Sequence, residues 1–240
     1  MDYFEIIEQE KKSSPQIEFP DNHEPKVQTW KSRLTFIWFL LLWQIQREAI
    51  GIPINKQQHF SFWRIALFLA IFLVCLCLSY RWARKHNLIP KIHWRLFPFG
   101  KIGIGLALMF AVGIISSLVM RLTGVTNTEN QEALNEMCKS LPVIVYFIAT
   151  TGAGFFEEML FRVGLFELLF NKWPKIAAIM SCLLFTLAHV PTNFASFVAY
   201  GSMSLVLTGL YYKYRNFYLN SSVHFLWNSL AVIVFLMSSK

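Results

Sequence analysis

Two adjacent glutamates, Glu157 and Glu158, interrupt an otherwise apolar stretch of the chain, and Arg162 follows in the same stretch. A charged side chain near the bilayer centre costs about 2.5–3.5 kcal/mol on insertion scales, so its presence in a membrane helix indicates a specific role. Glu158 and Arg162 have the i, i+4 spacing at which opposite charges face each other on a helix. Adjacent helical residues point about 100° apart, so Glu157 faces a different direction. The spacing predicts a buried Glu158–Arg162 pair that orients Glu157.

Two further polar motifs lie in apolar segments downstream. Phe185 and His189 are four residues apart, and His224 and Asn228 have the same spacing. Amide hydrolysis needs a base that activates water, a proton for the leaving amine and a donor for the developing oxyanion. We assign Glu157 as the base and Asn228 as an oxyanion donor. The two histidines either hold the water directly or bind a metal.

These residues can act without a metal, because Asn228, His189 and His224 suffice to hold a water against Glu157. The sequence therefore favours a site without a cofactor. If a metal is bound, zinc is the candidate, and its ligands would be His189, His224 and Glu157.

Each motif also has a purely structural interpretation. A Glu–Arg pair can be a structural ion pair, a histidine inside a membrane helix can bond a neighbouring helix, and Phe185 can be core packing. The three motifs nevertheless fall within one 72-residue stretch. Their joint occurrence favours one buried catalytic site formed by Glu157, Glu158, Arg162, His189, His224 and Asn228.

The composition is that of an integral membrane protein. Of the 240 residues, 55% are hydrophobic and only 15% are charged, whereas soluble domains carry about 25% charged residues. The formal net charge of +8 is uneven, because residues 1–33 hold seven acids and five bases. The basic surplus lies beside the apolar segments, which predicts contact with anionic lipid in the bilayer rather than with nucleic acid.

The apolar segments predict an all-α, polytopic transmembrane bundle of about seven spans. The spans are expected at 34–45, 60–80, 102–120, 141–170, 176–190, 195–212 and 217–237. The first is short for the roughly 20 residues that a bilayer requires, so six spans remain if it lies at the interface. We divide the chain into a polar N-terminal tail, N-terminal membrane helices and a catalytic core, at 1–33, 34–138 and 139–240.

The positive-inside rule orients the bundle. The loops at 81–101, 171–175 and 213–215 are basic and belong in the cytoplasm, whereas the loop at 121–140 is acidic and belongs outside. On straight helices His189 would lie roughly 10 Å further outward than Glu157 and His224. A tilted or deeply starting helix would have to bring His189 to the site.

The three motifs resemble those of a known family. E-E-M-L-F-R at 157–162, F-T-L-A-H at 185–189 and H-F-L-W-N at 224–228 match the E-E-x-x-x-R, F-x-x-x-H and H-x-x-x-N/D motifs of the CAAX-protease and bacteriocin-processing (Abi) family. The resemblance covers roughly 140–235. It implies an intramembrane endopeptidase of a bacterial cytoplasmic membrane that cleaves a peptide or membrane-associated protein with a glutamate-activated water.

Two other functions stay open. Some members of this family act in bacteriocin self-immunity or as scaffolds, which would make the chain a non-enzymatic membrane partner. A transporter with a proton relay would usually show paired repeats, and the sequence shows none. The motifs H-E-x-x-H, G-x-S-G and G-x-G-D of other intramembrane proteases are also missing from the sequence.

Overall fold

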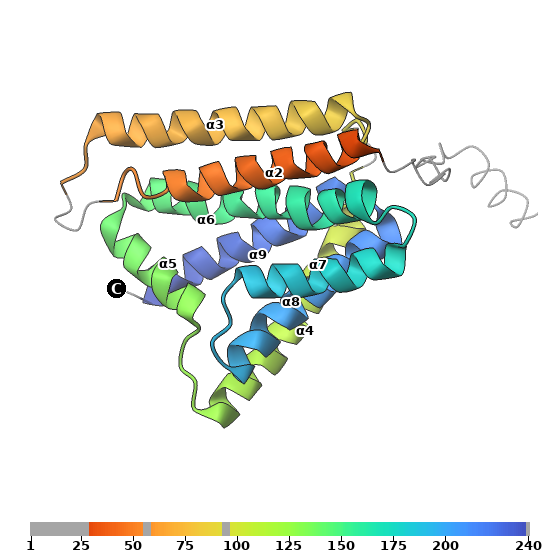
Figure 1. Cartoon of the computed structure of the whole chain (residues 1–240). Coiled ribbons are helices and arrows are strands. Elements are labelled where there is room, and N and C mark those ends of the chain that lie inside the picture. Colours follow the sequence, from red (N-terminus) through yellow and green to blue (C-terminus); the bar gives the residue numbers. More distant parts are fainter. Residues whose placement is uncertain (1–28, 55–58, 93–96, 239–240) are drawn as a thin grey trace, which may run out of the picture.

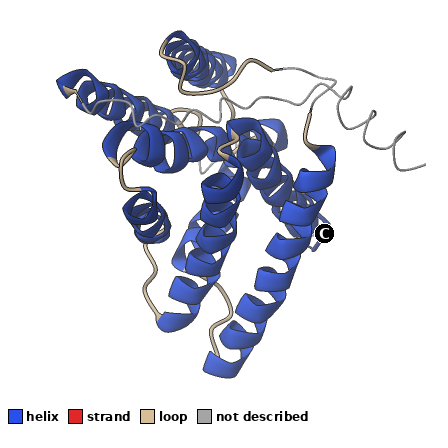
Figure 2. Cartoon of the chain, turned by 90° about the vertical axis from the view of Figure 1, so that its right-hand side faces the viewer, coloured by secondary structure: helices blue, strands red, loops and turns tan. Residues whose placement is uncertain are grey.

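The computed structural model describes residues 29–54, 59–92 and 97–238, and this part of the chain is built from helices and connecting loops (Figures 1 and 2). In order, the elements are α2 Trp30–Ala49, α3 Phe62–Lys85, α4 Phe99–Thr123, α5 Glu129–Ser140, α6 Val143–Glu158, the π-helix η2 Met159–Leu169, α7 Pro174–Ala188, α8 Phe194–Tyr214 and α9 Phe217–Ser238. The all-α prediction is confirmed. Most of the predicted tail lies outside the described residues, and α2 begins within its last four residues.

Within the described residues, five helices are long and apolar enough to cross a membrane, at 62–85, 99–123, 143–169, 194–214 and 217–237. The predicted number of about seven also included α2 and α7. With 15 residues, α7 is about 22 Å long, which is shorter than a hydrocarbon core of about 30 Å. The helix α2 carries charged residues in its first and last turns, which leaves it a shorter apolar stretch.

The helices form two groups that meet at α9 (Figure 1). On one side α3 lies along α2, and α2 packs against α6 and η2. On the other side α4 crosses α8, and both contact α9. The short helix α5 lies at one end of the bundle and connects α4 to α6. The predicted division at 138/139 stays a prediction, although α4 packs closely on the helices of the second part.

Short connections link neighbouring helices. After α4 the chain turns at Gly124, whose φ of 71° is in the left-handed region that glycine adopts freely. A capping box begins α8, since the Ser196 N–H donates to Asn193 Oδ1 at 2.9 Å and the Asn193 N–H donates to Ser196 Oγ at 3.1 Å. Only Arg215 and Asn216 separate α8 from α9. The three elements after η2 are therefore tightly linked.

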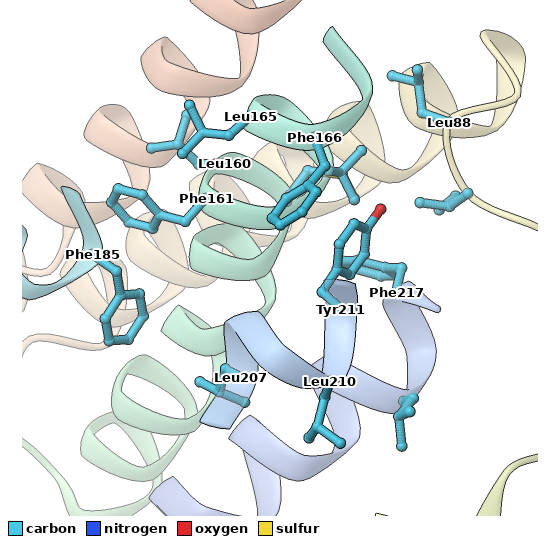
Figure 3. Packing of buried hydrophobic residues seen from close by; sticks show 14 of the residues in the cluster. Leu88, Leu160, Phe161, Leu165, Phe166, Phe185, Leu207, Leu210, Tyr211 and Phe217 are labelled. Carbon is cyan, nitrogen blue, oxygen red and sulfur yellow. The ribbon is translucent and has the colours of Figure 1, made fainter. Parts of the chain in front are cut away.

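The core around η2 is aromatic (Figure 3). The ring of Phe161 makes an edge contact with Phe185 of α7, with centroids 5.6 Å apart. Five residues further along, Phe166 packs on Tyr211 of α8, with centroids 5.2 Å apart. These contacts fix η2 against α7 and α8, and so fix the residues at its beginning, where the charged motif lies.

Candidate active site

The helix that carries the glutamates changes type immediately after Glu158. The sequence predicts one continuous helix over 141–170, but the structure has an α-helix to Glu158 and a π-helix from Met159. The Phe170 N–H donates to the Leu165 carbonyl at 2.9 Å, the wider i to i−5 pattern that a π-helix uses. The π-helix is rare, and π-helical turns inside α-helices are found frequently at functional sites.

Glu158 is the buried centre of the charged motif. Its Oε1 accepts a hydrogen bond from His224 Nδ1 at 2.9 Å, and its Oε2 accepts one from Asn220 Nδ2 at 3.1 Å. Arg162 Nε lies 3.3 Å from the same Oε2, and both side chains of this pair are 0% exposed. The expected pair therefore forms across the change of helix type, and it is joined by two residues of α9.

Arg162 is held by charge and by a ring rather than by hydrogen bonds. Its guanidinium lies over the ring of Phe185 at 4.5 Å, a cation–π contact. None of its three side-chain nitrogens has a hydrogen-bond partner within the part of the chain that the structure describes. Buried donors without partners cost free energy, so the interactions that stabilise Arg162 here are its ion pair with Glu158 and its contact with Phe185.

His224 lies between the two glutamates. Its Nδ1 contacts Glu158, and its Nε2 lies 3.6 Å from Glu157 Oε2. That second distance exceeds a hydrogen bond, so the Glu157 carboxylate keeps its capacity for another partner. Glu157 is also the more accessible of the two, with its side chain 15% exposed where Glu158 is fully buried. Glu157 is therefore the carboxylate that a water or a substrate can reach more easily.

The short α7 brings His189 to the same place. The helix ends at Ala188, and His189 follows as its cap. The ring of Phe185 lies 4.5 Å from the ring of His189 and 5.7 Å from that of His224. The Phe185 carbonyl accepts a hydrogen bond from His189 Nδ1 at 2.8 Å, which leaves Nε2 of a neutral ring as a free acceptor. His189 and His224 thus contact the same phenylalanine ring, although straight helices predict that they lie at different depths.

Asn228 lies one turn beyond His224 on α9. Its Nδ2 donates to the Thr150 carbonyl of α6 at 3.2 Å. An amide carries two N–H groups, so one remains for another acceptor. The structure therefore places Arg162, His189 and His224 around the ring of Phe185. Glu157 and Glu158 lie beside His224, and Asn228 lies at the α6–α9 interface.

Sequence reasoning did not single out Asn220. It is fully buried and donates to both Glu158 and the Leu207 carbonyl, the latter at 2.6 Å. The available signal was its position four residues before His224, on the same face of α9. Phe185 was assigned to packing alone, whereas its ring contacts the side chains of Arg162, His189 and His224.

Metal binding would need a closer group of ligands than this one. Within residues 29–54, 59–92 and 97–238, no three His, Cys, Asp or Glu side chains are gathered in a way that could hold a metal ion. The predicted trio of His189, His224 and Glu157 does not fit a metal in this arrangement. The expectation that the site works without a metal, with zinc as the candidate if one is bound, stays a prediction to be measured.

Gly154 lets the ring of His224 pack directly on α6. A Cβ at this position would lie 3.0 Å from His224 Cγ and 3.3 Å from its Nδ1. We expect Gly154→Ala to shift the ring by a few tenths of an ångström relative to Glu158 and to lower the rate of hydrolysis by up to about tenfold, less than the loss of about 100-fold that a full ångström of misplacement can cause. Gly209→Ala is the matched control, because nothing lies within 4 Å of a Cβ there. Equal rates for the two variants would show that the His224 position is not critical.

Comparison with known proteins identifies the family. A model of type II CAAX prenyl endopeptidases (Rce1-like) matches residues 139–230, which include all three motifs. The UPF0177 protein YvdC of Lactococcus lactis subsp. lactis is 45% identical over 182 residues, or 75% of this chain and 70% of YvdC. The chain belongs to the UPF0177 proteins of the CAAX-protease and bacteriocin-processing family. The family predicted from the motifs is confirmed.

Other members of the CAAX-protease and bacteriocin-processing family are more distant. The UPF0177 protein YbdI of the same organism is 33% identical over 45% of this chain and 59% of YbdI. The membrane-embedded CAAX protease MroQ of Staphylococcus aureus is 25% identical over 60% of each chain. No solved structure matches. The chain is thus a membrane protein from a family of intramembrane proteases.

Proposed function

We propose that this protein is an intramembrane endopeptidase that hydrolyses a peptide bond of a peptide or membrane-associated protein with a water activated by Glu157. The observation that carries the proposal is the position of His224, with Nδ1 2.9 Å from Glu158 and Nε2 3.6 Å from Glu157. A buried carboxylate fixes the imidazole, and a more accessible carboxylate stands at its other edge. This difference in burial suits a structural role for Glu158 and a catalytic role for Glu157.

In the proposed reaction Glu157 takes a proton from water while the water oxygen attacks the scissile carbonyl carbon. The second hydrogen of the water is held by His189 Nε2, which the bond from Nδ1 to Phe185 leaves as an acceptor. The remaining N–H of Asn228 stabilises the oxyanion. As the carbon–nitrogen bond breaks, Glu157 returns its proton to the leaving amine. The first products are a carboxylic acid, which keeps the second hydrogen of the water, and an amine; transfer of that remaining proton to the amine gives a carboxylate and an ammonium group.

The relatives support a protease over an immunity or scaffolding protein. MroQ is a membrane-embedded CAAX protease, and the matching family model describes endopeptidases. Burial of the charged pair Glu158–Arg162 also costs free energy that a scaffold would not require. The substrate itself is defined only by class, as a peptide bond that can reach Glu157.

A label from water tests the proposed hydrolysis. Membranes that contain the protein are incubated in water enriched in ¹⁸O, and new peptide termini are identified by mass spectrometry. We expect peptides whose new C-terminal carboxylate carries one ¹⁸O, absent from membranes without the protein. Folded protein that produces no labelled termini would contradict the proposal and favour the non-enzymatic alternative.

We expect hydrolysis to be independent of metal, because Glu157, His189 and Asn228 provide the groups that the reaction needs. Purified protein should contain less than one zinc per chain and keep its rate after treatment with a chelator. The contrary result would be one zinc per chain that is lost, together with activity, in both His189→Ala and His224→Ala.

We propose that the protein lies in the cytoplasmic membrane of a bacterium, with the basic loops inside. The test compares two exposed positions, Glu132 on α5 and Lys172 between η2 and α7. In intact cells, an impermeant thiol reagent should label Glu132→Cys but not Lys172→Cys. Lys172→Cys should react after the cells are opened. Labelling of Lys172→Cys in intact cells would reverse the orientation. The background for both variants replaces the four free cysteines Cys75, Cys77, Cys138 and Cys182.

A further inference from the structure

His189 follows the last residue of α7 and lies outside the regular helix. The next residue, Val190, has a φ of 50°, a left-handed conformation that a β-branched side chain rarely adopts. The chain therefore turns sharply at this point. A side chain at such a turn is not locked by the helical neighbours that fix a mid-helix residue, so its orientation depends on the groups around the ring.

A tyrosine of α8 stacks on the His189 ring. The centroids of His189 and Tyr200 are 4.5 Å apart with an angle of 22° between the planes. The Phe185 ring lies at the same distance, tilted by 35°. Stacking with Tyr200 resists rotation of the imidazole. Such a rotation would break the hydrogen bond from Nδ1 to the Phe185 carbonyl and would turn Nε2 away from the water of the proposed reaction.

The tyrosine is itself anchored at its hydroxyl. The Tyr200 and Thr128 hydroxyl oxygens are 2.7 Å apart. Thr128 is 5% exposed, and its Oγ1 caps α5 by accepting the Gln131 N–H at 3.2 Å. A chain of contacts therefore runs from the start of α5, through Tyr200, to the imidazole of His189. Figure 1 shows that α5 joins the chain between α4 and α6, at the end of the bundle where α8 begins.

We propose that Tyr200 is a positioning residue: its ring holds the imidazole of His189 with Nε2 toward the reacting water, and its hydroxyl is fixed by Thr128. The proposal rests on the proposed function, because it concerns the orientation of a histidine that holds the attacking water. Tyr200 acts on the rate through His189 and needs no contact with the substrate.

Kinetics on a synthetic peptide that spans an ¹⁸O-labelled cleavage site test the role in the reaction. Tyr200→Leu should lower kcat by about tenfold or more while KM stays within about twofold, because orientation rather than binding is lost. Tyr200→Phe keeps the ring and should keep most of kcat. Tyr212→Leu, at an exposed position of the same helix, is the matched control and should match the wild type. Wild-type kcat in Tyr200→Leu, or equal losses in the Phe and Leu variants, would overturn the proposal.

The anchor is tested by a double substitution. Tyr200→Phe and Thr128→Val each remove the hydroxyl contact between α8 and α5. If that contact is the shared cause, the double variant should have the same kcat as the more affected single variant. Effects that simply add would overturn the assignment of Thr128 as the anchor.

Nuclear magnetic resonance of the protein labelled with ¹⁵N-histidine reports on His189 without any substrate. The signals of His189 are those missing from a His189→Gln sample. In the wild type Nδ1 should carry the proton and Nε2 should not; in Tyr200→Leu the two tautomers should mix, and Tyr200→Phe should restore the first. An unchanged His189 signal in Tyr200→Leu would overturn the proposal even if kcat fell. This measurement is independent of cleavage. If the proposed function is wrong, the ¹⁸O experiment will show it separately, because wild-type membranes will yield no peptide termini that carry ¹⁸O.

Discussion

Replacing Glu157 by Gln is expected to lower the rate of peptide release by about 10²–10⁴-fold, the range that a positioned general base contributes. Gln keeps the size and shape of the side chain but cannot take a proton from water. The native side chain is 15% exposed, and its Oε2 lies 3.6 Å from His224 Nε2. Folding should therefore be little affected, because no short bond is lost.

The rate is measured per folded molecule in purified protein, with abundance and thermal unfolding measured alongside. Glu129→Gln is a suitable control, since this glutamate is exposed on α5. A Glu157→Gln variant that is well folded and turns over peptide like the control would remove Glu157 from the mechanism. Survival of an immunity phenotype in that variant would in addition favour a role without cleavage.

Replacing Arg162 by Ala is expected to destabilise the protein by about 3–5 kcal/mol, the usual cost of removing one partner of a buried ion pair. Arg162 and Glu158 are both fully buried, with Nε and Oε2 3.3 Å apart. The change would leave the Glu158 carboxylate without its cation and remove a contact with the Phe185 ring. Abundance in the membrane and activity should both fall, and the midpoint of thermal unfolding should drop.

A double variant separates charge from packing. Glu158→Gln with Arg162→Met removes both charges, keeps an acceptor for His224 Nδ1 and leaves no unpartnered guanidinium, so abundance should recover. Activity should not recover, because the His224 ring loses its charged partner. Lys139→Ala breaks an exposed pair, with side chains 67% and 72% exposed, and should cost at most about 1 kcal/mol. If Arg162→Ala is as stable as Lys139→Ala, the buried pair does not contribute as described.

The sequence predicted the parts of the site that depend on local spacing. Glu158 and Arg162 are four residues apart, and this spacing alone placed them side by side. The apolar composition likewise predicted a helical membrane protein, and the three motifs predicted its family. Spacing also predicted that Glu157 and Glu158 lie on different faces of the helix. In the structure Glu158 is fully buried, whereas the side chain of Glu157 is 15% exposed.

Contacts between distant helices could not be predicted in this way. Nothing local shows that His224 and Asn220 of α9 would bond Glu158, because that contact depends on how α6 and α9 cross. The π-helix after Glu158 has no sequence signal that we recognise, since its residues also suit an α-helix. The early end of α7 was missed for a related reason: the apolar run continues to Val190, while the helix stops at Ala188.

The most direct test of the central claim compares the peptides in bacterial membranes that carry the wild type, Glu157→Gln or Glu129→Gln at equal abundance. The account predicts peptides with new termini in the wild type and in Glu129→Gln, and their absence from Glu157→Gln. The same set of new termini in all three membranes would contradict the claim that Glu157 activates water for peptide-bond hydrolysis in this protein.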